Sequence, residues 1–344
     1  VNEFFENSHA FDPEVFDRFV EWFAYHLNNF GFQWNWLDWM EYANPEPEPI
    51  AGDDEESKKN RAVMHRFRHL FAKGVIERCV RHSSYDFMMN QLPPEMRSLL
   101  SNKPEPHLEI VTDGLVESVK NTITGKSKLE MDQVKDELYK LTAEAEEKDR
   151  FVLLIKAVLS GSCKTFSHFD IIAERYLPLI HALSAASGEA GQRDAVRAAL
   201  ALWAGVPQHT CYYLGRMMMM QIVPSVVVLQ VLLQNSPSVL VFRHTVEATE
   251  TWECIRTILS RAISAASAAN NRVTRAAYDA SHATEGEEEQ KIRDLEEARE
   301  QQKATTEHLE TTVKVLFERL LSMYLNSCEL VAQAENQDSV VDGT

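Results

Sequence analysis

Residues 16–39 hold an aromatic cluster that constrains the fold of this chain more than any other segment. The cluster contains four of the six tryptophans and five phenylalanines. Apolar residues recur at i, i+3, i+4 and i+7 from Phe16 to Leu27, which predicts one apolar stripe of a helix. Asp12 and Pro13 supply a helix cap and a proline suited to the first turn. Rings at this spacing predict a packed helical core, although tryptophans can also stack on nucleic-acid bases.

Helical periodicity continues along most of the chain, whereas strand patterns are nearly absent. Residues 44–56 predict a loop, because three prolines and an acidic run cannot continue a helix. Residues 62–89 predict one or two helices, and the prolines of 93–107 predict a stiff linker. The predicted helices that follow cover 108–124, 132–147, 150–160, 169–186, 192–204, 209–221 and 225–234. Helix pairs joined by short turns predict an all-α fold, an α-solenoid of antiparallel helix pairs of the armadillo or HEAT type.

The C-terminal third of the chain follows heptad spacing. One heptad line consists of Leu259, Ala262, Ala266, Ala269, Val273, Ala276 and Ala280. A second line, with a polar middle, consists of Ile292, Leu295, Arg299, Gln302, Thr306, Leu309, Val313, Leu316, Leu320 and Met323. Small residues along such a line let two helices approach closely. We therefore expect an antiparallel coiled-coil hairpin over 251–325 that projects from the repeat, and a disordered tail over 334–344.

Charge and cysteine usage exclude several classes of protein. A net charge of −17 disfavours extended direct contact with RNA or DNA, because the chain repels phosphate. The richest basic run, residues 58–81, spreads its charges around a whole helix, so a solvated face is favoured over a nucleic-acid groove. The five cysteines are far apart and form no CxxC pair, which favours reduced thiols over a disulfide framework or a zinc module. No apolar run reaches the ~18 residues of a membrane span.

Two sequence patterns resemble catalytic or ligand-binding motifs, but each lacks an essential part. Gly125, Lys126 and Ser127 look like the end of a phosphate-binding loop, yet the glycine required five residues earlier is Lys120. A polar turn between helices is therefore favoured. His65 and His69 have metal-ligand spacing, but Arg66 occupies the position where a metalloprotease motif needs glutamate. A surface histidine pair is the favoured interpretation.

The remaining candidates for chemistry are also incomplete. Cys163 and His168 could form a thiol–imidazole pair, but no third orienting group accompanies them. The acidic groups 53–56 and 287–289 lack the alternating ligands of a calcium loop. The methionines of 217–220 favour core packing over an adaptable binding groove. The sequence therefore predicts a protein that is not an enzyme and has no cofactor or metal site.

Six short segments carry a resemblance that extends over most of the chain. They are the aromatic cluster 16–39, VIERCVR at 75–81, QLPP at 91–94, KSK at 126–128, KTFSH at 164–168 and QIV at 221–223. In this order they resemble segments of the large subunit of the nuclear cap-binding complex. The hairpin 251–325 lies where that family has a long projecting coiled coil. The methionines of 217–220 depart from the family pattern, which is more polar there.

The resemblance implies three helical domains similar to the middle domain of eukaryotic initiation factor 4G. It would place residues 1–92 at the end of the second domain, 93–107 in a linker and 108–344 in the third domain. The first domain and the last helices of the family would then be missing. The absence of an initial Met agrees with a fragment of a longer polypeptide.

The same resemblance implies a non-enzymatic scaffold in the nucleus that shuttles to the cytoplasm. Such a subunit binds and orders a small RNA-recognition-motif subunit, which holds the 7-methylguanosine cap of RNA. The complex then recruits factors of mRNA processing, splicing, export, nonsense-mediated decay and early translation. We expect exposed partner-binding residues at Lys164, Tyr212, Tyr213 and Arg216. The alternative is a general helical-repeat scaffold of translation or mRNA decay without a cap-binding partner.

Overall fold

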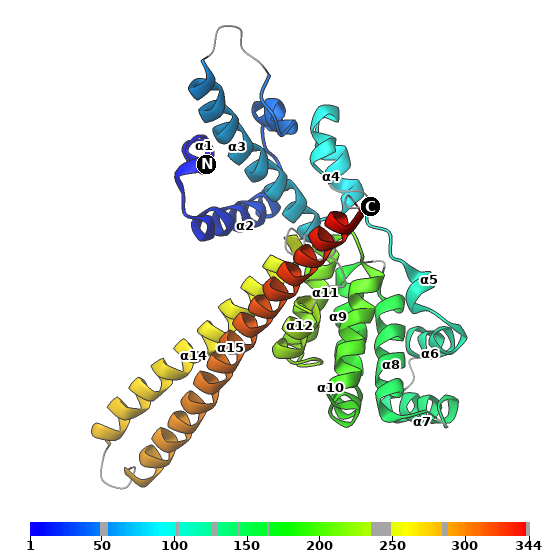
Figure 1. Cartoon of the computed structure of the whole chain (residues 1–344). Helices are drawn as coiled ribbons and strands as arrows, with labels where there is room; N and C mark the ends of the chain where they lie inside the picture. Colours follow the sequence, from blue (N-terminus) through cyan, green and yellow to red (C-terminus); the bar gives the residue numbers. More distant parts are fainter. Residues whose placement is uncertain are drawn as a thin grey trace. The chain divides into compact units, whose positions relative to one another are not determined.

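The computed structural model divides the chain into two compact units, Val1–Pro106 and His107–Thr344 (Figure 1). It describes residues 1–48, 54–100, 103–125, 130–143, 145–163, 165–234, 249–283 and 288–341, with side chains omitted at 249–250 and 334–341. All regular secondary structure in these ranges is helical, which confirms the predicted all-α class. The predicted linker 93–107 includes the short helix η3, Pro94–Leu99.

Unit 1 begins with two short helices and a longer one, which pack on a long central helix. Its elements are α1 (Asn2–Glu6), η1 (Ser8–Ala10), α2 (Pro13–Asn29), η2 (Trp36–Ala43), α3 (Glu55–His82), α4 (Tyr85–Gln91) and η3. The predicted cap of α2 is confirmed, since the Asp12 carboxylate accepts a hydrogen bond from the Glu14 N–H at 2.9 Å. The predicted helical region 62–89 divides into α3 and α4, because Ser84 caps a new helix by accepting from the Phe87 N–H at 3.2 Å.

Aromatic rings fill the core of unit 1. Phe71 of α3 is fully buried, and its ring lies 5.7 Å from Phe5 and 5.6 Å from Trp39. Trp36 and Trp39 are buried and Trp34 packs against the same core, as predicted. Trp22 is an exception, because half of it (50%) remains exposed on the outer face of α2. The expectation that all four tryptophans lie in the core is therefore wrong for Trp22.

Unit 2 stacks successive helices around a core between α8 and α10. The elements before the hairpin are α5 (Leu108–Val111), α6 (Gly114–Thr124), α7 (Met131–Leu141), α8 (Glu147–Gly161), α9 (Phe166–Arg175), α10 (Leu177–Leu202), α11 (Pro207–Met219) and α12 (Ser225–Leu232). Among these helices, the most extensive contacts join helices two apart in the chain, α6 with α8, α8 with α10 and α10 with α12, while α9 packs on α8 and α11, as expected of a helical repeat (Figure 1).

Three predicted helices in unit 2 have wrong boundaries: the helix 132–147 ends at Leu141, and the other two break for identifiable reasons. The predicted helix 108–124 breaks at Asp113, whose carboxylate accepts from the N–H groups of Leu115 and Val116 and so starts α6. The predicted helix 169–186 also breaks, because Pro178 lies in the first turn of a new helix, α10. The division predicted between 186 and 192 is confirmed, since Gly188 has non-helical backbone angles, with φ at +62°, and separates two helical stretches of α10.

The predicted hairpin is formed by α14 (Thr249–Ser281) and α15 (Glu288–Val341), which run side by side (Figure 1). Ala262 and Ala269 are buried between the two helices, as their heptad line predicts. On α15 the prediction is wrong for Ile292, Arg299 and Thr306, which are exposed.

Thr312 is fully buried in the interface between α14 and α15, which we call the seam. An aliphatic residue is the usual occupant of such a position. Its hydroxyl donates to the His308 carbonyl at 2.7 Å, so its polar atom is satisfied within α15 and its methyl group can pack. A pattern based on apolar residues alone misses such a position. Helix α15 also continues to Val341, into the segment 334–344 where a tail was predicted; residues 342–344 lie outside the described residues.

Candidate interaction surfaces

Three of the four predicted partner-binding residues, Tyr212, Tyr213 and Arg216, lie on α11, which packs against α9. The Tyr212 hydroxyl donates to one Asp170 carboxylate oxygen at 3.0 Å, and the Arg216 Nε–H donates to the other at 2.7 Å. Arg216 also lies 3.6 Å from the Glu174 carboxylate. One carboxylate on α9 thus fixes two side chains of α11 that are one helical turn apart, and both remain partly exposed.

Burial and the neighbouring carboxylate keep Tyr212 protonated. Desolvation is the larger cause, and the hydrogen bond to Asp170 adds to it; together they raise the pKa of Tyr212 to about 12. Tyr212 is therefore a neutral hydrogen-bond donor at physiological pH. Aromatic neighbours extend the surface, since the Phe166 ring lies 4.1 Å from Tyr212 and 4.7 Å from His209. We call Phe166, Asp170, Glu174, His209, Tyr212 and Arg216 the α9–α11 surface.

Tyr213, another of the four predicted residues, is not on this surface. Tyr213 is only 1% exposed, so the expectation that it is exposed is wrong. Its hydroxyl donates to the Ser162 carbonyl at 3.1 Å, and burial raises its pKa. Tyr213 points inward because it follows Tyr212 by one residue, about 100° around the helix. Lys164 lies outside the described residues.

An aromatic ladder on the outside of unit 1 was not predicted. Its successive ring-to-ring distances are 4.1 Å for Phe11–Phe4, 3.8 Å for Phe4–Phe19, 5.1 Å for Phe19–Trp22, 5.2 Å for Trp22–His26 and 4.6 Å for His26–Phe30. The i, i+3, i+4 spacing along α2 was the available signal, but it was interpreted as one buried stripe. The stripe is wide enough to be buried on one side and exposed on the other.

The candidates for metal or thiol chemistry have structural roles. His65 Nε2 donates to the Asn44 carbonyl and His69 Nδ1 to the Tyr42 carbonyl, both at 2.9 Å. His65 is buried and His69 partly buried, so the expectation of a surface pair is wrong. Burial raises the pKa of Cys163 to about 11, which disfavours a reactive thiolate. No group of three or more His, Cys, Asp or Glu side chains within the described ranges is placed to hold a metal ion.

The methionine run divides between core and surface. Met217, Met218 and Met220 are buried, as predicted, whereas Met219 is exposed. The predicted turn at Lys126 and Ser127 lies outside the described residues. Among the described helices, none combines the length and apolar character needed to cross a bilayer.

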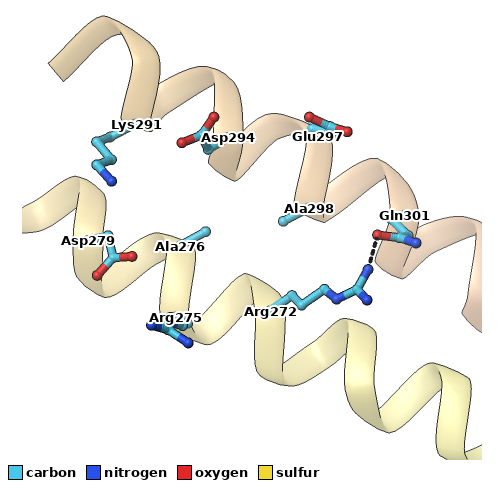
Figure 2. Close-up of a pocket in the computed structure, with 9 residues that line it drawn as sticks. All are labelled: Arg272, Arg275, Ala276, Asp279, Lys291, Asp294, Glu297, Ala298 and Gln301. Atoms are coloured by element: carbon cyan, nitrogen blue, oxygen red, sulfur yellow. Dashed lines mark hydrogen bonds between the residues drawn. The ribbon is translucent and has the colours of Figure 1, made fainter. Parts of the chain in front are cut away.

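A cavity of about 320 Å³ lies between the two hairpin helices (Figure 2). The space exists because the facing side chains of Ala276 and Ala298 are small. Charged side chains of both signs surround it, including Arg275, Asp279 and Lys291. Arg272 donates to the Gln301 side-chain carbonyl at 2.8 Å across the seam. Because the lining carries three cations and three carboxylates, the cavity shows no preference for a ligand of either charge.

Comparison with known proteins gives a consistent result. The family described as MIF4G like matches residues 114–342, and a second family of the same description matches residues 1–51. Nuclear cap-binding protein subunit 1 of Anopheles gambiae is 24% identical over 237 residues, which are 62% of this chain and 26% of that protein. The Xenopus tropicalis protein of the same name is 22% identical over 227 residues, 60% of this chain and 26% of its own length. The human protein is 32% identical over 88 residues, 26% of this chain and 9% of its own length. The matches thus span about a quarter or less of these relatives.

Proposed function

Because the chain belongs to the MIF4G-like family, we propose that it acts as a non-enzymatic scaffold within a nuclear cap-binding large subunit. It binds and orders a small RNA-recognition-motif subunit, and that subunit holds the capped end of RNA. Residues 1–92 form the end of the second domain, 93–107 the linker and 108–344 most of the third domain. The protein works in the nucleus, shuttles to the cytoplasm and helps to recruit RNA processing and export factors.

The similarity to nuclear cap-binding protein subunit 1 in several animals is the observation that carries this proposal. The packing of unit 2 supports the scaffold role. Helices α8 and α10 bury a continuous apolar core, so the surfaces that they position are rigid before any partner binds. A rigid surface lowers the entropy lost when a mobile partner becomes ordered on it.

The α9–α11 surface is the contact that we assign to the small subunit. Asp170 already fixes Tyr212 and Arg216, so little side-chain freedom is lost on binding. Tyrosine and arginine are also the residue types that most often dominate interface energies. The net charge of −17 favours a basic partner, both for the small subunit and for basic tails of export factors.

Retention on a cap resin tests the proposal. The full chain is co-expressed with the small RNA-recognition-motif protein of the same organism, and both are applied to immobilised 7-methylguanosine. We expect both proteins to be retained together and released by free cap analogue, whereas the chain alone should pass through. Failure of the two proteins to co-purify would contradict the proposal and favour a scaffold of translation or mRNA decay without a cap-binding partner.

A matched pair of variants tests the assigned surface. Arg216→Ala removes a side chain that is fixed by Asp170, and Arg193→Ala removes an arginine of α10 that pairs with Glu189 of its own helix. We expect Arg216→Ala to weaken binding of the small subunit by about tenfold and Arg193→Ala to leave it unchanged. Equal effects of the two variants would exclude the α9–α11 surface as the contact.

A further inference from the structure

Both carboxylate oxygens of Asp170 are engaged within the α9–α11 surface. One accepts from the Tyr212 hydroxyl at 3.0 Å, and the other accepts from the Arg216 Nε–H at 2.7 Å. The Asp170 side chain is 25% exposed, compared with 63% for Glu174 one turn later on α9. Asp170 therefore presents little of itself to a partner, and its influence on a partner passes through the two side chains that it holds.

The positive charge of Arg216 is already compensated inside this surface. Its Nε atom lies 2.7 Å from the Asp170 carboxylate, and one of its terminal nitrogens lies 3.6 Å from the Glu174 carboxylate. Its other terminal nitrogen lies 3.8 Å from the sulfur of Met219, a residue that is 56% exposed. Two carboxylates facing one guanidinium leave an excess of negative charge. A carboxylate or phosphate of a partner would be repelled by that excess, so Arg216 is not placed to bind an anion.

Arg175 does not change this balance of charge. It follows Glu174 by one residue, so its side chain leaves α9 about 100° further around the helix. Its guanidinium carbon lies 6.0 Å from the centre of the Tyr176 ring. The groups that face Arg216 from α9 are thus the carboxylates of Asp170 and Glu174.

We infer that Asp170 is the positioning residue of the α9–α11 surface. It acts on the small subunit through Tyr212 and Arg216 without contacting it, and Arg216 meets an uncharged group of that subunit, an aromatic ring or a peptide carbonyl. A guanidinium stacks on aromatic rings as well as binding anions. The rings of Phe166 and Tyr212, 4.1 Å apart, make the rest of the surface suited to uncharged groups. This inference rests on the proposed function and deepens it.

Titration of the small subunit onto the full chain, followed by calorimetry, tests the role of Asp170. Asp170→Ala should weaken binding by about tenfold, because it releases both Tyr212 and Arg216. Asp170→Asn keeps one acceptor oxygen and should lose less. The control is Asp194→Ala, which removes a carboxylate of α10 that pairs with Arg197 of its own helix and should bind like the wild type.

A double-mutant cycle separates positioning from direct contact. In a chain that already carries Tyr212→Phe and Arg216→Ala, Asp170→Ala should cause no further loss, because neither side chain still bonds to Asp170. The same loss in this background as in the wild type would show that Asp170 contacts the partner itself and would overturn the inference. Thermal unfolding of each variant separates the structural contribution. A loss of binding confined to temperatures at which Asp170→Ala is partly unfolded would assign Asp170 a structural role and would also overturn it.

Two replacements of Arg216 test the chemistry of the partner. Arg216→Gln keeps a planar donor without charge, whereas Arg216→Lys keeps the charge without the planar fork. We expect Arg216→Gln to bind the small subunit more tightly than Arg216→Lys, and added salt to weaken the wild type and Arg216→Gln equally. The reverse order, with a larger salt dependence in the wild type, would show that Arg216 binds an anion of the partner and would overturn the inference.

Failure of the proposed function gives a different result from failure of this inference. If the small subunit does not bind the wild-type chain, the scaffold proposal fails and the inference fails with it. If the two proteins are retained together on the cap resin, but Asp170→Ala binds as tightly as Asp194→Ala, the scaffold proposal stands and only the positioning role of Asp170 is refuted.

Discussion

Unit 1 and the α14–α15 hairpin both pair helices, but they place side chains of opposite size between them. In unit 1 the Phe71 ring lies within 6 Å of Phe5, Phe16 and Trp39. In the hairpin the buried positions at the middle of the seam are Ala262, Ala269 and Thr312. Large side chains fill the space between the several helices of unit 1, and small side chains fit between the two helices of the hairpin.

Size determines how closely two helices approach and how much each residue contributes. Large rings keep helices apart but bury a large apolar area per residue, so a few short helices can enclose a core. Small residues bring two helices close over a long distance, with a small contribution from each contact. Unit 1 should therefore depend on single residues, whereas the hairpin should depend on the continuity of its seam.

Loss of one ring in unit 1 should have the largest effect. Phe71→Ala removes a fully buried side chain that several other rings contact. We expect the free energy of unfolding of unit 1 to fall by about 3–5 kcal/mol, from lost burial and the cavity left behind. Hydrogen exchange measured by mass spectrometry should show faster exchange over α2 and α3.

Trp22→Ala is the matched control for this prediction. It removes a larger ring, but one that is half exposed on the outer face of α2. We expect the free energy of unfolding to fall clearly less than in Phe71→Ala, because the Trp22 ring buries a smaller share of its apolar surface when the protein folds. If the two variants are equally destabilised, burial is not what distinguishes the rings of unit 1.

Enlarging a seam residue should have the next largest effect. Ala269 is buried against α15, so Ala269→Leu must push the two helices apart or adopt a strained rotamer. We expect a loss of about 1–3 kcal/mol, measured as faster hydrogen exchange in both α14 and α15. Ala268→Leu places the same side chain on the exposed neighbour and should change exchange little. Stabilisation by Ala269→Leu would mean that the seam contains unfilled space.

The contrast between the two regions also explains how far the sequence could predict the fold. The helix at α2, its cap at Asp12 and the alanine line of α14 follow from local spacing and were confirmed. Spacing gives the width of an apolar stripe but not the number of neighbours that cover it. The exposure of Trp22 depends on that number, so it could not be predicted from spacing alone.

The candidate surface shows the same limit. The sequence pointed to α11, but it placed Tyr213 outward with Tyr212, although adjacent helical residues face different directions. Nothing in the local pattern connects Asp170 to Arg216, because the pair depends on how α9 packs against α11. Likewise, Thr312 enters the seam only because its hydroxyl bonds within its own helix. Contacts between distant segments decide these details.

Removal of a polar contact across the seam should have a smaller effect. The Gln302 amide donates to the Asn270 side-chain carbonyl at 2.9 Å. Asn270→Ala removes this bond at a site open to solvent, so we expect a loss of about 0.5–1 kcal/mol. Local hydrogen exchange around 270 and 302 should report it. Asn271→Ala, on the exposed neighbouring position, should have less effect, and an equal loss would mean that helix propensity rather than the bond is responsible.

Lowering the pH should produce the smallest difference in stability between unit 1 and the hairpin. Burial is the main cause that lowers the pKa of His69 and of His82, both in unit 1. Below the ordinary histidine pKa of about 6.5 the unfolded chain then binds more protons than the folded chain, so the stability of unit 1 decreases as the pH falls from 7 toward 5. Unfolding of unit 1, followed by its tryptophan fluorescence at several pH values, should show this decrease.

The seam of the hairpin provides the comparison for this last prediction. Ala262, Ala269 and Thr312 carry no titratable side chain. The protection factors of the backbone amides along the seam should therefore change less over the same pH range. His82→Gln tests the cause, because it keeps a polar side chain but removes the protonation site. The variant should flatten the pH dependence of unit 1 below pH 6.5. An unchanged slope in both His82→Gln and His69→Gln would assign the acid sensitivity to carboxylates instead.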